Sequence, residues 1–83
     1  MAEKKIGNIT HFFDNINVGI IELENTLKIG DKIRIEGATT NFEQEVNSMQ
    51  YDHEDIESAD SGQEVGIKVD EKVREGDEVY LLE

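Results

Sequence analysis

Apolar residues along the chain fall into short alternating segments separated by turn-forming residues. The clearest alternation covers residues 32–36, where Ile33 and Ile35 point one way and charged residues point the other. Nowhere do apolar residues recur at helical spacing for three turns. The pattern therefore predicts an all-β domain of six strands, at residues 5–13, 18–23, 32–36, 42–51, 63–69 and 78–82.

The apolar spacing shifts phase inside two of these segments. In the first, the shift indicates a bulge near Gly7 or Asn8, and in residues 42–51 the apolar positions slip once. The chain has no proline, so an open sheet would have two unprotected edges. Because small barrels use bulges to turn their corners, we expect a small closed six-stranded barrel. Residues 52–61 are the most polar stretch, and we expect a loop there with room for one helical turn, anchored by Ile56 and Ala59.

Length and composition limit what the fold can hold. The 83 residues allow one domain, residues 1–83, and a hydrophobic content of 36% fills one core without a large ligand cavity. There is no cysteine, which excludes disulfides and thiolate metal sites. The first residues lead into strand-like sequence without an apolar signal stretch, and no apolar run is long enough to span a bilayer. We therefore expect a cytoplasmic protein without membrane contact.

The net charge is −12, from 20 acidic and 8 basic residues. A polyanion repels nucleic-acid phosphates, and the basic residues are scattered along the chain without a basic stripe. This charge disfavours nucleic acid and leaves three interpretations: solubility, a surface complementary to a basic partner, or a halophile's acidic coat. Solubility is the default interpretation.

Two histidines are candidates for chemistry. His53 lies among carboxylates in residues 52–55, but the alternate donors, glycine and distal glutamate of a calcium loop are absent, which favours a solvated acidic loop. His11 has no serine, cysteine or carboxylate at motif spacing, so it is interpreted as a strand residue at the rim and not as a general base. The sequence predicts no catalytic residue, no metal ligand and no cofactor.

Four aromatic residues invite a nucleic-acid interpretation. A stacking platform for bases would use ring faces flanked by basic side chains. The rings here lack basic neighbours, so packing in the core and at the rim is the simpler interpretation for Phe12, Phe13, Phe42 and Tyr51.

Glycines provide the most specific signal in the sequence. Gly30 and Gly76 each precede an aspartate at the start of an expected strand, and Gly62 lies in another expected turn. Gly66 lies inside an expected strand, where glycine lets another backbone approach closely.

These glycines belong to three strings that occur in series: Leu-Lys-x-Gly-Asp-Lys-Ile, Ala-x-x-Gly-Gln-x-Val-Gly-Ile and Gly-Asp-x-Val. From residue 6 to residue 82, their order and spacing resemble the second domain of translational GTPases such as elongation factor Tu and initiation factor two. The chain length and the string Met-Gln-x-Asp-His resemble small stand-alone elongation-factor-like proteins. They also resemble the barrel appended to some collagenase-type peptidases. The resemblance implies a six-stranded barrel with Greek-key connections.

The resemblance has consequences for function. There is no phosphate-binding loop of the Gly-x-x-x-x-Gly-Lys-Ser/Thr type, which excludes nucleotide binding and GTPase activity of that kind. In elongation factor Tu the second domain helps to hold the aminoacyl end of transfer RNA, which implies Gln63 and Glu64 as candidate binding positions here. We therefore expect a non-enzymatic binding module that docks on a protein partner. The alternative is an RNA-associated translation accessory that binds transfer RNA or the ribosome.

Overall fold

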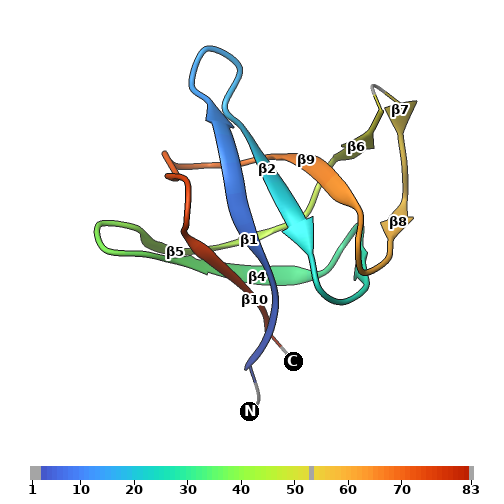
Figure 1. Ribbon diagram of the computed structural model, residues 1–83, viewed down its shortest axis with the longest axis horizontal. Helices are drawn as coiled ribbons and strands as arrows, with labels where there is room; N and C mark the ends of the chain where they lie inside the picture. Colours follow the sequence, from blue (N-terminus) through green and yellow to red (C-terminus); the bar gives the residue numbers. More distant parts are fainter. Residues whose placement is uncertain (1–2, 53, 83) are drawn as a thin grey trace.

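The computed structural model describes residues 3–52 and 54–82, and all the regular structure in them is β-sheet. Figure 1 shows the strands wrapped around a common interior, with the two termini side by side. The strands are β1 (Glu3–Phe13), β2 (Val18–Leu23), β3 (Leu27–Lys28), β4 (Lys32–Glu36), β5 (Asn41–Glu45), β6 (Met49–Tyr51), β7 (Glu54–Asp55), β8 (Ser58–Ala59), β9 (Glu64–Lys68) and β10 (Glu78–Leu82).

Eight strands form one antiparallel sheet in the order β5-β4-β10-β1-β2-β9-β6-β7, and β3 pairs separately with β8. The two ends of the described chain lie side by side because β1 pairs with β10, with Glu3 opposite Leu82. The prediction of an all-β fold is confirmed. The sheet has eight hydrogen-bonded strands with β5 and β7 at its edges, so the predicted closed barrel of six strands is not confirmed by the strand pairing.

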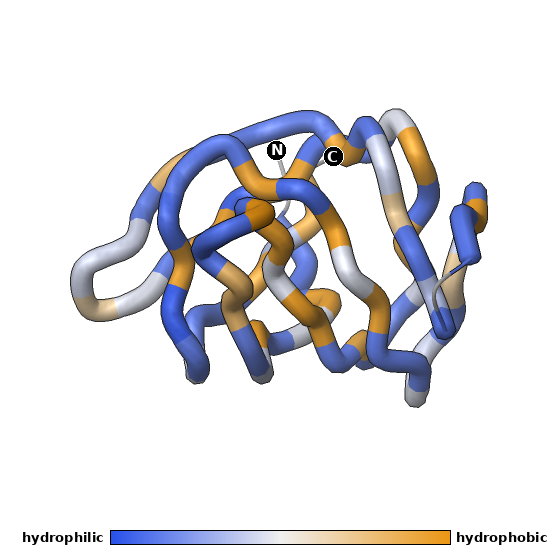
Figure 2. The backbone as a smooth tube through the Cα atoms, turned by 90° about the horizontal axis from the view of Figure 1, so that it is seen from above, coloured by the Kyte–Doolittle hydropathy of each residue, from blue (hydrophilic) through white to orange (hydrophobic). Residues whose placement is uncertain are grey.

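The core consists of the inward-facing residues of almost every strand. Figure 2 shows the consequence as alternating hydrophobic and hydrophilic positions along the chain. Ile33 and Ile35 are fully buried, as the alternation in residues 32–36 predicts. The buried hydrophobic residues are Ile6, Ile9, Ile21, Leu23, Leu27, Ile33, Ile35, Phe42, Val46, Met49, Ala59, Val65, Ile67, Val69, Val73 and Val79.

The long strand β1 bends at two register shifts. Against β10 the register shifts between Lys5 and Gly7, and against β2 it shifts between Ile9 and His11. The first shift confirms the bulge predicted near Gly7. Because of these two shifts, β1 pairs with β10 and with β2 at different angles, and the sheet curves around the core.

The predicted strand at residues 42–51 is divided into β5 and β6. Between them, Val46 leaves the ladder, because its N–H donates to the carbonyl of Asp31 and its carbonyl accepts from the N–H of Gly30. As a result β5 pairs with β4, whereas β6 pairs with β9. The phase slip seen in the sequence therefore marks a corner of the sheet.

The polar stretch at residues 52–61 is not a plain loop, and its described residues contain no helical turn. Asp52 adopts a left-handed conformation (φ 53°) at the turn into β7, which pairs with β6, and β8 pairs with β3. Ala59 is buried and Ile56 packs against the core, as expected for the two anchors. Hydrogen bonding to neighbouring strands gives this stretch order that its composition does not show.

One turn geometry occurs three times, at residues 28–31, 60–63 and 74–77. In each, the third residue is a glycine with φ near +90°, a conformation that strains a residue with a side chain. The fourth residue donates its N–H to the first carbonyl, and its side-chain oxygen accepts from the first N–H. The fourth residues are Asp31, Gln63 and Asp77.

Each of these turns pairs with one buried apolar residue of another segment. The glycine N–H donates to the carbonyl of that residue, and the carbonyl of the fourth turn residue accepts from its N–H, at 2.8–2.9 Å. The apolar partners are Val46, Leu23 and Ile9, in the order of the three turns. The glycine strings in the sequence are therefore required by the way these turns join the sheet.

Gly66 has a different role from the one predicted. A Cβ added there would lie 3.1 Å from the Val18 side chain and 3.2 Å from that of Ile20, so side chains, not backbone, approach it. The close backbone approach occurs at Gly7, where an added Cβ would overlap the carbonyl of Glu22.

Candidate functional site

Apolar side chains remain exposed on the outer face of the β1–β2 hairpin. Phe13 is 46% exposed and Ile16 is 56% exposed, whereas Val18 and Ile20 are half-buried beside them. Together with β6 and β9 they form a groove of about 260 Å³, the hairpin groove. Its lining residues are Phe13, Ile16, Val18, Ile20, Gln50, Asp52, Glu64 and Gly66.

Strand register explains why a groove forms here. Ile20 of β2 is opposite Gly66 of β9, which in turn is opposite Gln50 of β6. Because Gly66 has no side chain, the side chains of Val18 and Ile20 pack over it, 3.1 and 3.2 Å from where a Cβ would stand. The hairpin turn at residues 14–17, which projects beyond the sheet in Figure 1, contributes Ile16 to the lining of the groove. A left-handed residue, Asn17 (φ 55°), completes that turn.

Polar and acidic groups line the rest of the groove. Glu64 is fixed by the Thr10 hydroxyl, which donates to its Oε2 at 3.3 Å, and Asp52 contributes a second carboxylate. Next to the groove, the His11 ring stacks on Phe13 with ring centroids 6.3 Å apart, and its Nδ1 lies 3.8 Å from Glu75 Oε2. The arrangement combines an apolar centre with negative charge at its border, which suits contact with a peptide segment rather than bond-breaking chemistry.

The two candidate binding residues lie in different environments. Glu64 lines the hairpin groove. Gln63 does not, because its side-chain Oε1 accepts from the N–H of Asp60 at 2.7 Å within one of the three turns. A binding role for either residue stays a prediction. The apolar residues of the hairpin were not predicted as a site, although Phe13 next to an Asn/Asp turn and Ile16 within it gave a signal.

The aromatic residues do not form one platform. Phe42 is buried in the core and Phe12 packs against it, whereas Phe13 and Tyr51 are exposed. In the described residues the one stacked ring pair is that of His11 with Phe13. His53 lies outside the described residues, and the described part of the chain has no cluster of three or more histidine or acidic residues able to hold a metal.

A polar network covers the adjoining face formed by β4, β10 and β1. Arg34 pairs with Glu3 at 2.6 Å and with Glu36 at 3.2 Å, and its guanidinium lies 5.1 Å above the Tyr80 ring. On the same face the Tyr80 hydroxyl donates to Glu78 at 3.0 Å. These contacts pair the charged groups with one another. This face is therefore a weaker candidate for contact with a partner than the hairpin groove is.

This network predicts a pH effect at Glu3. The hydrogen bond from Arg34, supported by its charge, lowers the pKa of Glu3 below its ordinary value. A carboxyl whose pKa is lower in the folded than in the unfolded state stabilises the fold above the unfolded pKa, and this contribution is lost as the pH falls through the folded pKa. NMR titration of the Glu3 carboxyl should give a low midpoint that rises in the variant Arg34→Met. An unchanged midpoint would show that the ion pair does not form in solution.

Comparison with known proteins finds similarity to parts of longer proteases. It is 49% identical over 79 residues to an uncharacterized protease of Methanocaldococcus jannaschii and 38% identical over 80 residues to a collagenase of Porphyromonas gingivalis. Each match covers 94% of this chain but only 19% and 22% of the relatives, so the chain spans about a fifth of the curated relatives it matches. No protein-family model matches the chain.

Solved structures share the fold. Two crystal structures of the C-terminal domain of a putative U32 peptidase from Geobacillus thermoleovorans superpose with TM-scores of 0.88 and 0.90, at 16% identity. The matches cover 92% and 96% of this chain and 96% and 93% of those chains. The comparisons support the resemblance to the accessory domain of collagenase-type peptidases and give no support to the resemblance to translation factors. No helix in the described residues is long and apolar enough to cross a membrane.

Proposed function

We propose that the chain is a non-catalytic accessory domain of the type found in U32 peptidases and collagenase-like proteins, and that it docks on a protein through the hairpin groove. The observation that carries the proposal is the exposure of Phe13 and Ile16 along the hairpin groove. Exposed apolar side chains that surround a hollow and border on charge are typical of protein contact sites. The chain matches about a fifth of the length of larger proteases, which supports an accessory role.

We also propose that the sheet curves into a closed barrel of the six-stranded type. The reason is that β5 and β6 follow one another with only residues 46–48 between them. With β5 beside β4 and β6 beside β9, this bent pair of strands would connect the two sides of the sheet. Gln44 supports closure, since its buried amide donates to the carbonyl of Lys68 at 2.8 Å and accepts from the N–H of Asp70 at 2.8 Å. A closed wall would give the hairpin groove a rigid base.

The docking proposal predicts selective loss of a partner. The double variant Phe13→Ser, Ile16→Ser should fold normally, because both side chains are largely exposed, but should lose at least about tenfold in partner recovery. Ile29→Ser is the matched control, since Ile29 is exposed but does not line the groove. The measurement is quantitative mass spectrometry of proteins that co-purify with each tagged variant.

Equal recovery with the double variant would contradict docking through the groove. The same tagged proteins separate the two partner classes, because transfer RNA or ribosomes in the purified material would favour the RNA-associated alternative. We expect neither. The net charge of −12 opposes RNA binding, and in the described residues Arg34 and Lys5 are already paired with carboxylates.

A further inference from the structure

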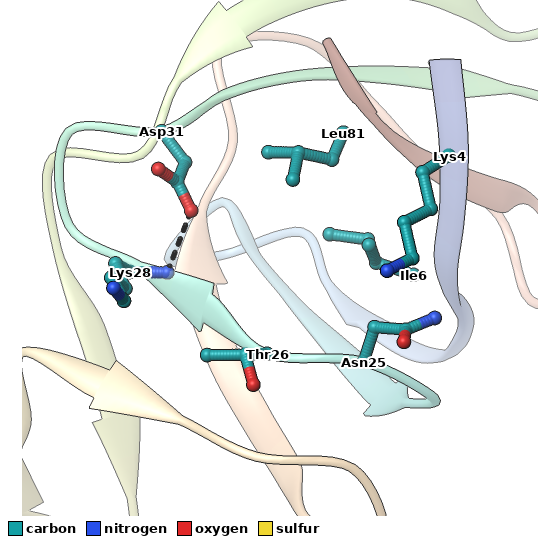
Figure 3. Close-up of a pocket in the computed structure, with 7 residues that line it drawn as sticks. All are labelled: Lys4, Ile6, Asn25, Thr26, Lys28, Asp31 and Leu81. Atoms are coloured by element: carbon teal, nitrogen blue, oxygen red, sulfur yellow. Dashed lines mark hydrogen bonds between the residues drawn. The ribbon is translucent and has the colours of Figure 1, made fainter. Parts of the chain in front are cut away.

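A second concavity, of about 410 Å³, lies away from the hairpin groove and shares no lining residue with it. It is bounded by the start of β1, the residues after β2, the β3–β4 turn and the end of β10 (Figure 3). Its lining residues are Lys4, Ile6, Asn25, Thr26, Lys28, Asp31 and Leu81. We call it the lysine pocket.

The two kinds of charged group in the lysine pocket, ammonium and carboxylate, lie on different sides of its apolar residues. In Figure 3 the Lys4 side chain and the Asp31 carboxylate stand on opposite sides, with Leu81 and Ile6 between them. Ile6 is fully buried behind the pocket, whereas Leu81 is half-buried and is the apolar side chain that a ligand can touch. A ligand entering here would contact the Lys4 ammonium, the Leu81 side chain and the Asp31 carboxylate.

Several polar groups of the lysine pocket already form hydrogen bonds within the chain. The polar groups without such bonds are the ones available to a ligand. Asn25 donates through Nδ2 to the carbonyl of Lys5, Thr26 donates to Asp60, and Asp31 Oδ2 accepts from the N–H of Lys28 at 2.9 Å. By contrast, the ammonium groups of Lys4 and Lys28 form no salt bridge with a described residue, unlike that of Lys5.

The charge of the lysine pocket selects the kind of anion. Two lysines and one aspartate give a local charge of +1 within a chain of net charge −12. A monoanion neutralises this charge, whereas a phosphate dianion would add repulsion from Asp31. The half-buried Leu81 side chain further favours a carboxylate that carries an aliphatic group over a small hydrophilic anion.

We propose that the lysine pocket binds the C-terminal carboxylate of a peptide that ends in an aliphatic residue. The carboxylate pairs with the Lys4 ammonium, with Lys28 as a second cation at the edge. The aliphatic side chain packs on Leu81. Asp31, whose Oδ1 has no hydrogen bond among the described residues, accepts from the N–H of the terminal residue.

The test uses N-acetyl-leucine as the probe, titrated into the isotope-labelled chain and followed by the NMR signals of its backbone amides. We expect saturable shifts confined to the amides of Lys4, Asn25, Lys28 and Leu81. N-acetyl-leucinamide, which has the same side chain without the charge, should bind about tenfold more weakly, and so should inorganic phosphate. Lys4→Gln should weaken N-acetyl-leucine binding by about tenfold, whereas Lys72→Gln, at an exposed lysine outside the pocket, should not.

Three results would overturn the proposal. Equal binding of the amide would show apolar contact without carboxylate recognition, and equal or tighter binding of phosphate would show a general anion site. Absence of localised shifts would show that the pocket binds no such ligand. Because the two sites share no residue, none of these results bears on docking through the hairpin groove.

Discussion

Replacing Gly7 by alanine is expected to destabilise the domain by about 3 kcal/mol or more. The added Cβ would overlap the backbone carbonyl of Glu22 and approach the Ile21 side chain at 2.8 Å. Backbone in the middle of a paired strand cannot move without breaking the β1–β2 ladder, so the strain has no inexpensive release. In a domain of this size, the melting temperature should fall by about 10 °C or more, as measured by circular dichroism or calorimetry.

Gly66→Ala is the matched control for Gly7→Ala. Its added Cβ would meet the flexible side-chain ends of Val18 and Ile20, which can shift, so we expect a loss of about 1 kcal/mol. If both variants lost the same stability, or if Gly7→Ala were harmless, the close contact of β1 with β2 would be wrong.

Replacing Gln44 by leucine is expected to cost about 3 kcal/mol. Gln44 is only 6% exposed, and its removal would leave the carbonyl of Lys68 and the N–H of Asp70 without their partner. A buried polar group left unpaired costs about 1–3 kcal/mol, and the added apolar contact offsets part of the loss of two. The measurement is urea denaturation, combined with hydrogen exchange at the Asp70 amide, which should become faster.

Gln50→Leu provides the comparison for Gln44→Leu. Gln50 is exposed, and its amide bonds to the Asp55 side chain at 3.0 Å, so this change should alter stability by less than about 0.5 kcal/mol. A stable Gln44→Leu variant with a protected Asp70 amide would contradict the bridge between β5 and the end of β9, and with it barrel closure.

The strands with a regular period of two could be predicted from the sequence. In β4 and β9 every second residue is buried, so the hydrophobic pattern determines which face is inside. The bulge at Gly7 was predictable for the same reason, because a shift in the period marks an extra residue.

Features that depend on distant partners could not be predicted. β7 and β8 have two residues each, and only pairing with β6 and β3 orders them. The corner at Val46 depends on hydrogen bonds to a turn at residues 28–31. Neither the short pairings nor the corner has a periodic signal of its own.

The candidate site was predictable only in part. Glu64 was predicted through a resemblance and lines the groove. Gln63 was predicted in the same way, but its side chain accepts a hydrogen bond within one of the three turns. The glycines on which the resemblance to translation factors rested include those of the repeated turn. Its glycines and its Asp or Gln are required by backbone hydrogen bonds, so they report the fold more strongly than the function.

The hairpin groove itself was missed because it depends on register. Only the pairing of Ile20 with Gly66 and of Gly66 with Gln50 places a missing side chain next to exposed apolar ones. In the sequence, these residues are separated by up to 46 positions, as Ile20 and Gly66 are, and nothing local indicates that they meet.

The central claim is that a protein partner contacts the hairpin groove, and site-specific photo-crosslinking tests it most directly. A benzophenone amino acid at Ile16, in the hairpin turn, is compared in cells with the same group at Ile29, which is exposed outside the groove. We predict one reproducible crosslinked protein from position 16 and none from position 29. Crosslinks that are absent at position 16, or the same at both positions, would contradict the proposed docking site.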